Sequence, residues 1–240
     1  MKESFVSIVL PVYNQADHIT QVVEQYENAL SKITATRELI LVVNGSKDNS
    51  LEICYNLQKK YSTLKIIHSQ EGGWGRAVKL GLKEAQGEII CYTNSARTSA
   101  AELRQAILYA LDNPGTVIKA NRKIRYNLFR MLGSYLFNFE CRFLFDLTVW
   151  DINGTPKVFP RQYDYLRKLS RDDDLIDLEF NFICKMHNYP MLEVPIFSSR
   201  RHNGRSTTGW YSALGMYLGV FSMWCERKKN LKDYEQTLNN

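Results

Sequence analysis

Three stretches in the first hundred residues decide the fold: SIVLPVYN (7–14), ELILVVNGSKDNS (38–50) and GGWGRAVKLGLKEAQGEIICYTNSA (72–96). Each pairs a short apolar, β-branched run with a polar or glycine-containing turn. We predict strands at 5–12, 38–43, 64–68, 88–93 and 116–120, with helices at 17–31, 48–61, 75–86 and 99–111 between them. This alternation predicts an α/β domain with a mostly parallel central sheet and helices on both faces.

The second half of the chain has a different, aromatic-rich pattern. We expect a helical stretch at 126–150, a strand at 152–159, a helix at 175–187 and a strand at 191–197. Twenty uncharged residues follow at 206–225, with a helical stripe of Trp210, Leu214, Tyr217, Phe221 and Trp224. The stripe favours an amphipathic helix in a membrane interface; a packed core helix and a membrane span are the alternatives. We therefore divide the chain into a domain at 1–205 and a C-terminal helix with a polar tail at 206–240.

The charge balance favours anionic partners. The chain has 31 Lys and Arg against 25 Asp and Glu, a net charge of +6. Such an excess suits nucleotides, lipid phosphates or an acidic membrane surface. No basic run with interleaved aromatics is present, so we expect no nucleic-acid partner. The five cysteines are scattered and never spaced as CxxC, which predicts neither a disulfide framework nor a zinc site and favours a reducing compartment. The short apolar N-terminus stops at Pro11 and is interpreted as a strand, not a signal peptide.

Three strand-end loops form the candidate ligand site, because ligands of such sheets bind beyond the carboxyl ends of the strands. In the first, Tyr13 can lie against a planar base. In the second, Gly45 lets the backbone approach a ligand closely. The third, GGWGR (72–76), opens a helix whose N-terminus favours anions. Each loop alone is typical of an ordinary strand–turn–helix connection, but their meeting at one edge predicts a nucleotide site.

In order and spacing, these motifs resemble glycosyltransferase family 2, whose members typically read xIVxPxYN, VVDDGSxD and, after a further strand, Asp-x-Asp. Residues 122–130, the segment DINGTPKVF (151–159) and Arg201-x-x-Gly204-x-Ser206 resemble the polyprenyl-phosphate branch of that family, typified by dolichol-phosphate mannose synthase. The resemblance implies a GT-A fold and a nucleoside-diphosphate sugar as donor. It also implies inverting transfer to a dolichyl or undecaprenyl phosphate, at the cytoplasmic face of a membrane.

The chain departs from the family at two carboxylate positions. Val43 and Asn44 stand where the family has two aspartates, and Asn94-Ser95-Ala96 replaces the Asp-x-Asp that usually holds Mg²⁺ or Mn²⁺. An amide, a hydroxyl and a methyl are poor ligands for a hard divalent cation. We therefore expect weak or no metal binding, with Arg76, Arg97 or a helix N-terminus balancing the diphosphate charge. A non-catalytic nucleotide-sugar-binding subunit is the alternative of another class.

The resemblance implies three sets of site residues. The nucleotide sugar would contact Pro11, Tyr13, Asn14, Asn44, Gly45, Ser46, Gly73, Arg76, Asn94 and Ser95. The acceptor phosphate would contact Arg122, Arg125, Arg130, Lys157, Arg201 and Ser206. The catalytic residues would be Asn94, Asp151 and Arg201.

The acceptor decides whether a base is needed. A phosphate dianion attacks without one, whereas a hydroxyl acceptor in polysaccharide or glycolipid synthesis needs a carboxylate to take its proton. Asp151 is the first candidate for that base. Asp177 and Glu179 are further candidates, although we interpret them as charges at a helix N-terminus.

Overall fold

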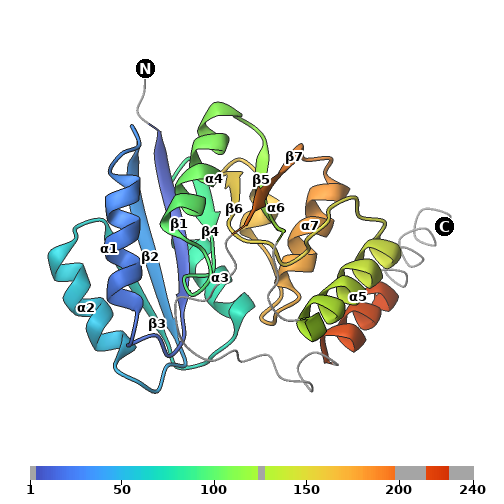
Figure 1. Cartoon of the computed structure of the whole chain (residues 1–240), viewed down its shortest axis with the longest axis horizontal. Helices are drawn as coiled ribbons and strands as arrows, with labels where there is room; N and C mark the ends of the chain where they lie inside the picture. The colour runs from blue at the N-terminus through green and yellow to red at the C-terminus, as the bar shows by residue number, and fades with distance from the viewer. Residues whose placement is uncertain (1–3, 124–127, 198–214, 227–240) are drawn as a thin grey trace, which may run out of the picture.

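The computed structural model describes residues 4–123, 128–197 and 215–226, with the side chains of 128–130 left aside. Seven strands form one sheet in the order β3-β2-β1-β4-β6-β5-β7 (Figure 1). The strands are β1 Phe5–Val12, β2 Thr36–Asn44, β3 Leu64–Ser69, β4 Ile89–Tyr92, β5 Val117–Arg122, β6 Lys157–Pro160 and β7 Met191–Ile196. The helices are α1 Ile19–Leu30, α2 Ser50–Lys60, α3 Trp74–Glu84, α4 Ala100–Asp112, α5 Leu128–Phe145, α6 Asp164–Arg167 and α7 Ile176–Met186. Residues 215–226 are also helical.

The predicted alternation is confirmed in the first half, where the ends of the elements differ from expectation by no more than two residues. Strands β3, β2, β1 and β4 are parallel, and β5 is parallel to β7. Strand β6 runs antiparallel to both of its neighbours, β4 and β5. It is shorter than predicted, because residues 152–156 form a turn before it instead of extending it.

Helices cover both faces of the sheet. One apolar layer joins the strands to α1, α2 and α4, with Tyr26 and Leu103 fully buried in it. The opposite layer joins them to α3, α6 and α7, with Val78 and Phe180 at its centre. Because β1 and β2 are buried on both sides, their runs are nearly continuous in apolar residues, which is the pattern that predicted them.

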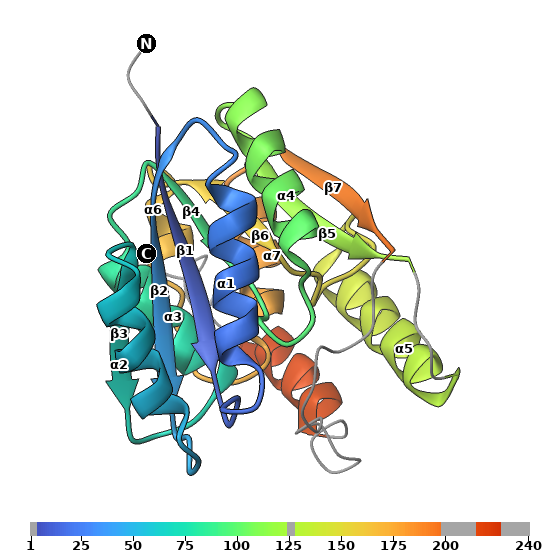
Figure 2. The same cartoon turned by 60° about the vertical axis from the view of Figure 1, so that its left-hand side comes forward.

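A third apolar cluster joins α5, α7 and the helix at 215–226, which is drawn in red beside α5 (Figures 1 and 2). Val220 is buried, and the Tyr217 hydroxyl donates to the Gly133 carbonyl of α5 at 2.6 Å. The amphipathic C-terminal helix is thus confirmed over these residues, and one of its faces packs on the body of the protein. Leu218 and Phe221 on its other face are exposed. Among the described helices, none is long and apolar enough to cross a membrane.

Candidate nucleotide-sugar site

The loops after β1 and β2 are bonded to each other at the carboxyl edge of the sheet, the lower edge in Figure 2. The Asn14 amide donates to the Ser46 hydroxyl at 3.1 Å, and the Asn14 side-chain oxygen accepts from the Lys47 amide at 2.8 Å. Asn14 has a φ of 48°, in the left-handed region that asparagine tolerates better than most residues. The predicted meeting of these two loops is confirmed.

A second set of bonds ties the β1 loop to α2. The Gln15 amide donates to Ser50 at 2.8 Å, and the Ala16 amide donates to the Asp48 carboxylate at 3.0 Å. Burial alone would raise the pKa of Asp48, but the hydrogen bonds from Ser50 and Ala16 lower it below its usual value. Asp48 is therefore charged at neutral pH, and it accepts at 3.1 Å from the amide of Ser50, the first residue of α2.

The loop after β4 joins the same edge through Ser95. Its hydroxyl is within hydrogen-bonding distance of the Gln15 side-chain oxygen (2.8 Å) and the Pro11 carbonyl (3.2 Å). Tyr13 stands beside these bonds with 41% of its surface exposed. An exposed ring next to a fixed backbone is available to lie against a base, as the sequence predicts.

Asn44 connects β2 to the glycine-rich loop. Its side-chain nitrogen donates to the Gly73 carbonyl at 3.0 Å, while its buried side-chain oxygen has no hydrogen-bond partner within the described part of the chain. Gly45 follows with a φ of +62°, and a Cβ there would stand 2.8 Å from the Gly72 nitrogen. Only glycine fits at this turn, because the two loops touch through their backbones.

The glycine-rich loop also packs against the backbone of the segment before α7. A Cβ at Gly75 would stand 2.5 Å from the carbonyl oxygens of Arg171 and Asp173. Gly75 thus makes room for the segment before α7. Arg76 pairs with Glu71 and lies 3.5 Å from the Asp172 carboxylate, so acidic side chains already compensate its charge.

The segment Asn94-Ser95-Ala96 does not fit a divalent cation. The Asn94 side-chain oxygen accepts from the Ala96 amide at 3.0 Å, Ser95 is fully buried in the bonds described above, and Ala96 has no ligand atom in its side chain. Over the residues the structure describes, no group of three or more His, Cys, Asp or Glu side chains is placed to hold a metal ion. The described residues therefore offer no conventional carboxylate set, and weak metal dependence stays a prediction.

On the acceptor side, Arg122 and Asp151 form a two-pronged ion pair. The guanidinium donates to the two carboxylate oxygens at 2.7 Å each, and the Arg122 amide adds a third bond at 3.1 Å. Asp151 is almost fully buried, whereas Arg122 keeps part of its side chain exposed. The carboxylate thus fixes the direction of the guanidinium. As a base, Asp151 would first have to give up these bonds.

Lys157, a predicted acceptor-phosphate residue, is part of a buried ion pair. Its ammonium is fully buried and donates to the Asp177 carboxylate. Burial lowers the pKa of Lys157 to about 8, although Asp177 opposes the shift. In the described arrangement Lys157 has no exposed surface and is paired with Asp177, so its contact with an acceptor phosphate stays a prediction that would require this pair to open.

Asp177 and Glu179 lie in the first turn of α7, as predicted, but they are not solvated charges. Both are buried. Glu179 accepts from the amides of Ser170 and Arg171, and Asp177 accepts from Lys157, Tyr92 and Trp74. A further buried lysine, Lys119, pairs with Glu193 at 2.9 Å. The signal for this network was a lysine inside each of two apolar strands, VIKANR and KVFP, because a buried lysine requires a buried acidic partner.

Several predicted acceptor residues lie outside the described residues: Arg125, Arg201 and Ser206, together with the side chain of Arg130. Their roles stay predictions.

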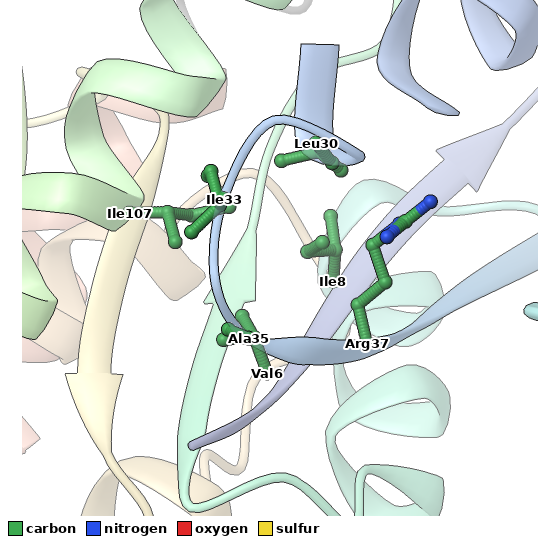
Figure 3. A pocket seen from close by; sticks show the side chains of 7 residues that line it. All are labelled: Val6, Ile8, Leu30, Ile33, Ala35, Arg37 and Ile107. Carbon is green, nitrogen blue, oxygen red and sulfur yellow. The ribbon is translucent and has the colours of Figure 1, made fainter. Parts of the chain in front are cut away.

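A small apolar pocket at the amino ends of β1 and β2, far from the loops above, is lined by Val6, Ile8, Leu30, Ile33, Ala35, Arg37 and Ile107 (Figure 3). Its one charged side chain, Arg37, pairs with Glu27 at 2.6 Å, and the rest of the lining is apolar.

The sequence pattern of Glycosyl transferase family 2 matches residues 7–166 of the chain. A dolichol-phosphate mannosyltransferase of Pyrococcus furiosus is 25% identical over 120 residues, covering 50% of this chain and 34% of that protein. An undecaprenyl-phosphate 4-deoxy-4-formamido-L-arabinose transferase of Proteus mirabilis is 27% identical over 137 residues, covering 55% and 42%. Glycosyltransferase GlyG of Streptococcus pneumoniae is 34% identical over 91 residues, covering 38% and 29%. The chain thus spans less than half the length of each of these relatives.

Among solved structures, glucosyl-3-phosphoglycerate synthase from Mycobacterium tuberculosis, in complex with Mn²⁺, uridine diphosphate and glucosyl-3-phosphoglycerate, superposes with a TM-score of 0.69. The match covers 93% of this chain and 80% of that one at 16% identity, which supports the GT-A fold and nothing finer. The family pattern covers about two thirds of the residues and includes each of the strand-end loops described above. The chain belongs to glycosyltransferase family 2.

Proposed function

We propose that the protein transfers a sugar, with inversion, from a nucleoside diphosphate to a polyprenyl phosphate at the cytoplasmic face of a membrane. The observation that carries the proposal is the bonding of four loops into one edge around Asn44. The buried side-chain oxygen of Asn44 has no hydrogen-bond partner within the described residues. Such an atom destabilises the folded protein unless a ligand donates a hydrogen bond to it. The imino N–H of uracil or guanine is such a donor, which supports a uridine or guanosine diphosphate.

The Arg122–Asp151 pair supports a phosphate as the acceptor. Because Asp151 holds both prongs of the guanidinium, the exposed part of Arg122 has a fixed direction in which to meet an anion. A phosphate monoester has a second pKa of roughly 6 and is largely dianionic at neutral pH. One of its oxygens forms a bond to the anomeric carbon while the bond from that carbon to the diphosphate breaks. The electron pair leaves with the nucleotide, and no proton has to move.

A hydroxyl acceptor fits this site less well. It would require Asp151 to take a proton while that carboxylate is buried and bonded three times by Arg122. Each of those bonds favours the charged carboxylate and so makes it a weaker base. The names of the two phospholipid-using relatives support the same choice of acceptor.

The exposed apolar face of α5 also supports a lipid acceptor. Leu132, Leu136, Phe139 and Phe143 recur along that helix at spacings of four, three and four, and all are more than half exposed. Leu218 and Phe221 of the C-terminal helix are exposed as well. A patch of this kind on a protein that uses a lipid substrate suits the boundary between headgroups and acyl chains. We therefore propose that α5, with the exposed face of the C-terminal helix, contacts the membrane.

The test of the proposal is product analysis. The purified protein is incubated with labelled nucleotide sugars and extracted membrane lipids, and the lipid fraction is examined by mass spectrometry. A sugar-1-phospholipid is expected. An O-glycoside would indicate the hydroxyl acceptor, and nucleotide binding without any product would indicate a non-catalytic subunit.

The membrane contact is tested separately by flotation with vesicles of phosphatidylglycerol and phosphatidylcholine. Phe139→Ser together with Phe143→Ser should release most of the bound protein, because each exposed ring is worth roughly 1.5–3 kcal/mol when buried in an apolar phase. Tyr55→Ser is the matched control, since Tyr55 is an exposed aromatic residue on α2. Equal binding by both variants would assign α5 a different partner.

A further inference from the structure

The glycine-rich loop is held from two opposite sides. On one side, Asn44 donates to the Gly73 carbonyl at 3.0 Å. On the other, the indole nitrogen of Trp74 donates to a carboxylate oxygen of Asp177 at 3.1 Å. Trp74 and Asp177 are separated by 103 positions in the sequence, and the mechanism proposed above uses neither. Trp74 is the first residue of α3, so a shift of its ring would move the start of that helix.

Asp177 is suited to hold this loop because it is itself held firmly. Its other carboxylate oxygen accepts from the Tyr92 hydroxyl at 2.9 Å and from the Lys157 ammonium. Tyr92 also packs edge-on against Trp74, with 6.4 Å between the ring centroids. The carboxylate therefore has two buried donors on the sheet side and one donor, the indole, on the loop side.

We propose that Asp177 is a positioning residue of the nucleotide site: through Trp74 it holds the glycine-rich loop against Asn44 in the geometry that the nucleotide requires. This rests on the proposed nucleotide-sugar function. Asp177 itself has no exposed face toward the donor and takes no proton in the reaction. The indole N–H is its direct bond to the loop, and removing that bond can be compared with removing its bond to Tyr92 on the sheet side.

The test compares two variants that each remove one neutral donor from Asp177 and keep an aromatic side chain. Trp74→Phe removes the bond to the loop, and Tyr92→Phe removes a bond to the sheet. The free energy of unfolding from urea titration should fall by similar amounts in both. Affinity for uridine or guanosine diphosphate, from isothermal titration, should weaken roughly three- to tenfold in Trp74→Phe, the effect of losing one hydrogen bond, and less than twofold in Tyr92→Phe.

Hydrogen exchange of the amides at 72–76 in the free protein gives a readout without nucleotide. Trp74→Phe should speed this exchange severalfold, and Tyr92→Phe should leave it near the wild-type rate. Equal exchange and equal affinities in the two variants would overturn the positioning role. If the wild-type protein binds no nucleoside diphosphate, the proposed function fails, and faster exchange in Trp74→Phe alone would still support Asp177 as the anchor of this loop.

Discussion

The donor side and the acceptor side of the sheet edge are built from different kinds of polar group. The donor loops are joined mainly by backbone amides and short neutral side chains such as Asn14, Ser46 and Ser95. The proposed acceptor side, with the strands and helix packed behind it, instead contains charged pairs within the body of the protein: Lys119, Arg122, Lys157, Asp151, Asp177 and Glu193. An unpaired buried neutral group costs less free energy than an unpaired buried charge. The neutral edge is thus suited to receive a substrate, and most of the charged network holds the architecture.

The largest expected effect comes from breaking one buried pair. Lys157→Met removes the cation and leaves Asp177 buried with neutral donors only, which should cost about 3–5 kcal/mol of unfolding free energy. The donor-side comparison is Asn14→Ala, which should cost only about 0.5–1.5 kcal/mol. Urea titration of both variants measures the difference. Similar, small losses would mean that the two sides are not built differently.

The next effect concerns Arg201, which lies outside the described residues and inside Arg-x-x-Gly-x-Ser. A charge-assisted contact to the acceptor phosphate is worth roughly 1.5–3 kcal/mol, so Arg201→Ala should lower transfer to lipid by about ten- to a hundredfold. Nucleotide affinity should stay the same, and Arg201→Lys should restore only part of the rate because it lacks the planar fork. Arg200→Ala is the control. Equal losses at Arg200 and Arg201 would indicate a diffuse basic surface.

A third effect is a pH dependence of stability that belongs to the charged side alone. The pKa of Lys157 is about 8 in the folded protein, below its ordinary value of 10.5. Between these two pH values the unfolded chain holds a proton that the folded chain has released, so raising the pH favours the folded state. The reference is the double variant Lys157→Met/Asp177→Leu, which lacks this pair. Compared with it, the free energy of unfolding of the wild type should rise by ~1–3 kcal/mol from pH 8 to 10.5. A flat difference between the two proteins would show that Lys157 stays charged.

The smallest effect is expected from metal removal. Asn94 is bonded within its own loop, Ser95 is bonded to the loop after β1, and Ala96 has no ligand atom. EDTA should therefore change the transfer rate by less than about twofold. The check is the rate with EDTA, and then with Mn²⁺ or Mg²⁺ added back. Loss of transfer with EDTA and full recovery with Mn²⁺ would show that carboxylates such as Asp48 or Asp151 bind metal in the complex.

The sequence predicted the donor half far better than the acceptor half, for physical reasons. The apolar runs of β1 and β2 fix both the strands and the edge at which their loops meet, so Tyr13, Asn14 and Asn44 could be placed without coordinates. The pairing of Lys157 with Asp177 joins β6 to α7 across twenty positions of sequence, and no local pattern specifies it. Asp177 does lie in the first turn of α7, and a helix N-terminus alone already explains an acidic residue there, so its burial against Lys157 is not predicted.

The most direct test of the account is nucleotide binding at the joined loops. Isothermal titration of the wild-type protein with the diphosphates of uridine, guanosine, cytidine and adenosine should show binding of the uridine or guanosine form. Asn44→Ala should weaken that binding by about ten- to a hundredfold, because a buried hydrogen-bond partner of the base is lost. Lys60→Ala, an exposed change on α2, should leave it intact. No binding of any of the four nucleotides at millimolar concentration, or equal affinities in the wild type and Asn44→Ala, would contradict the account.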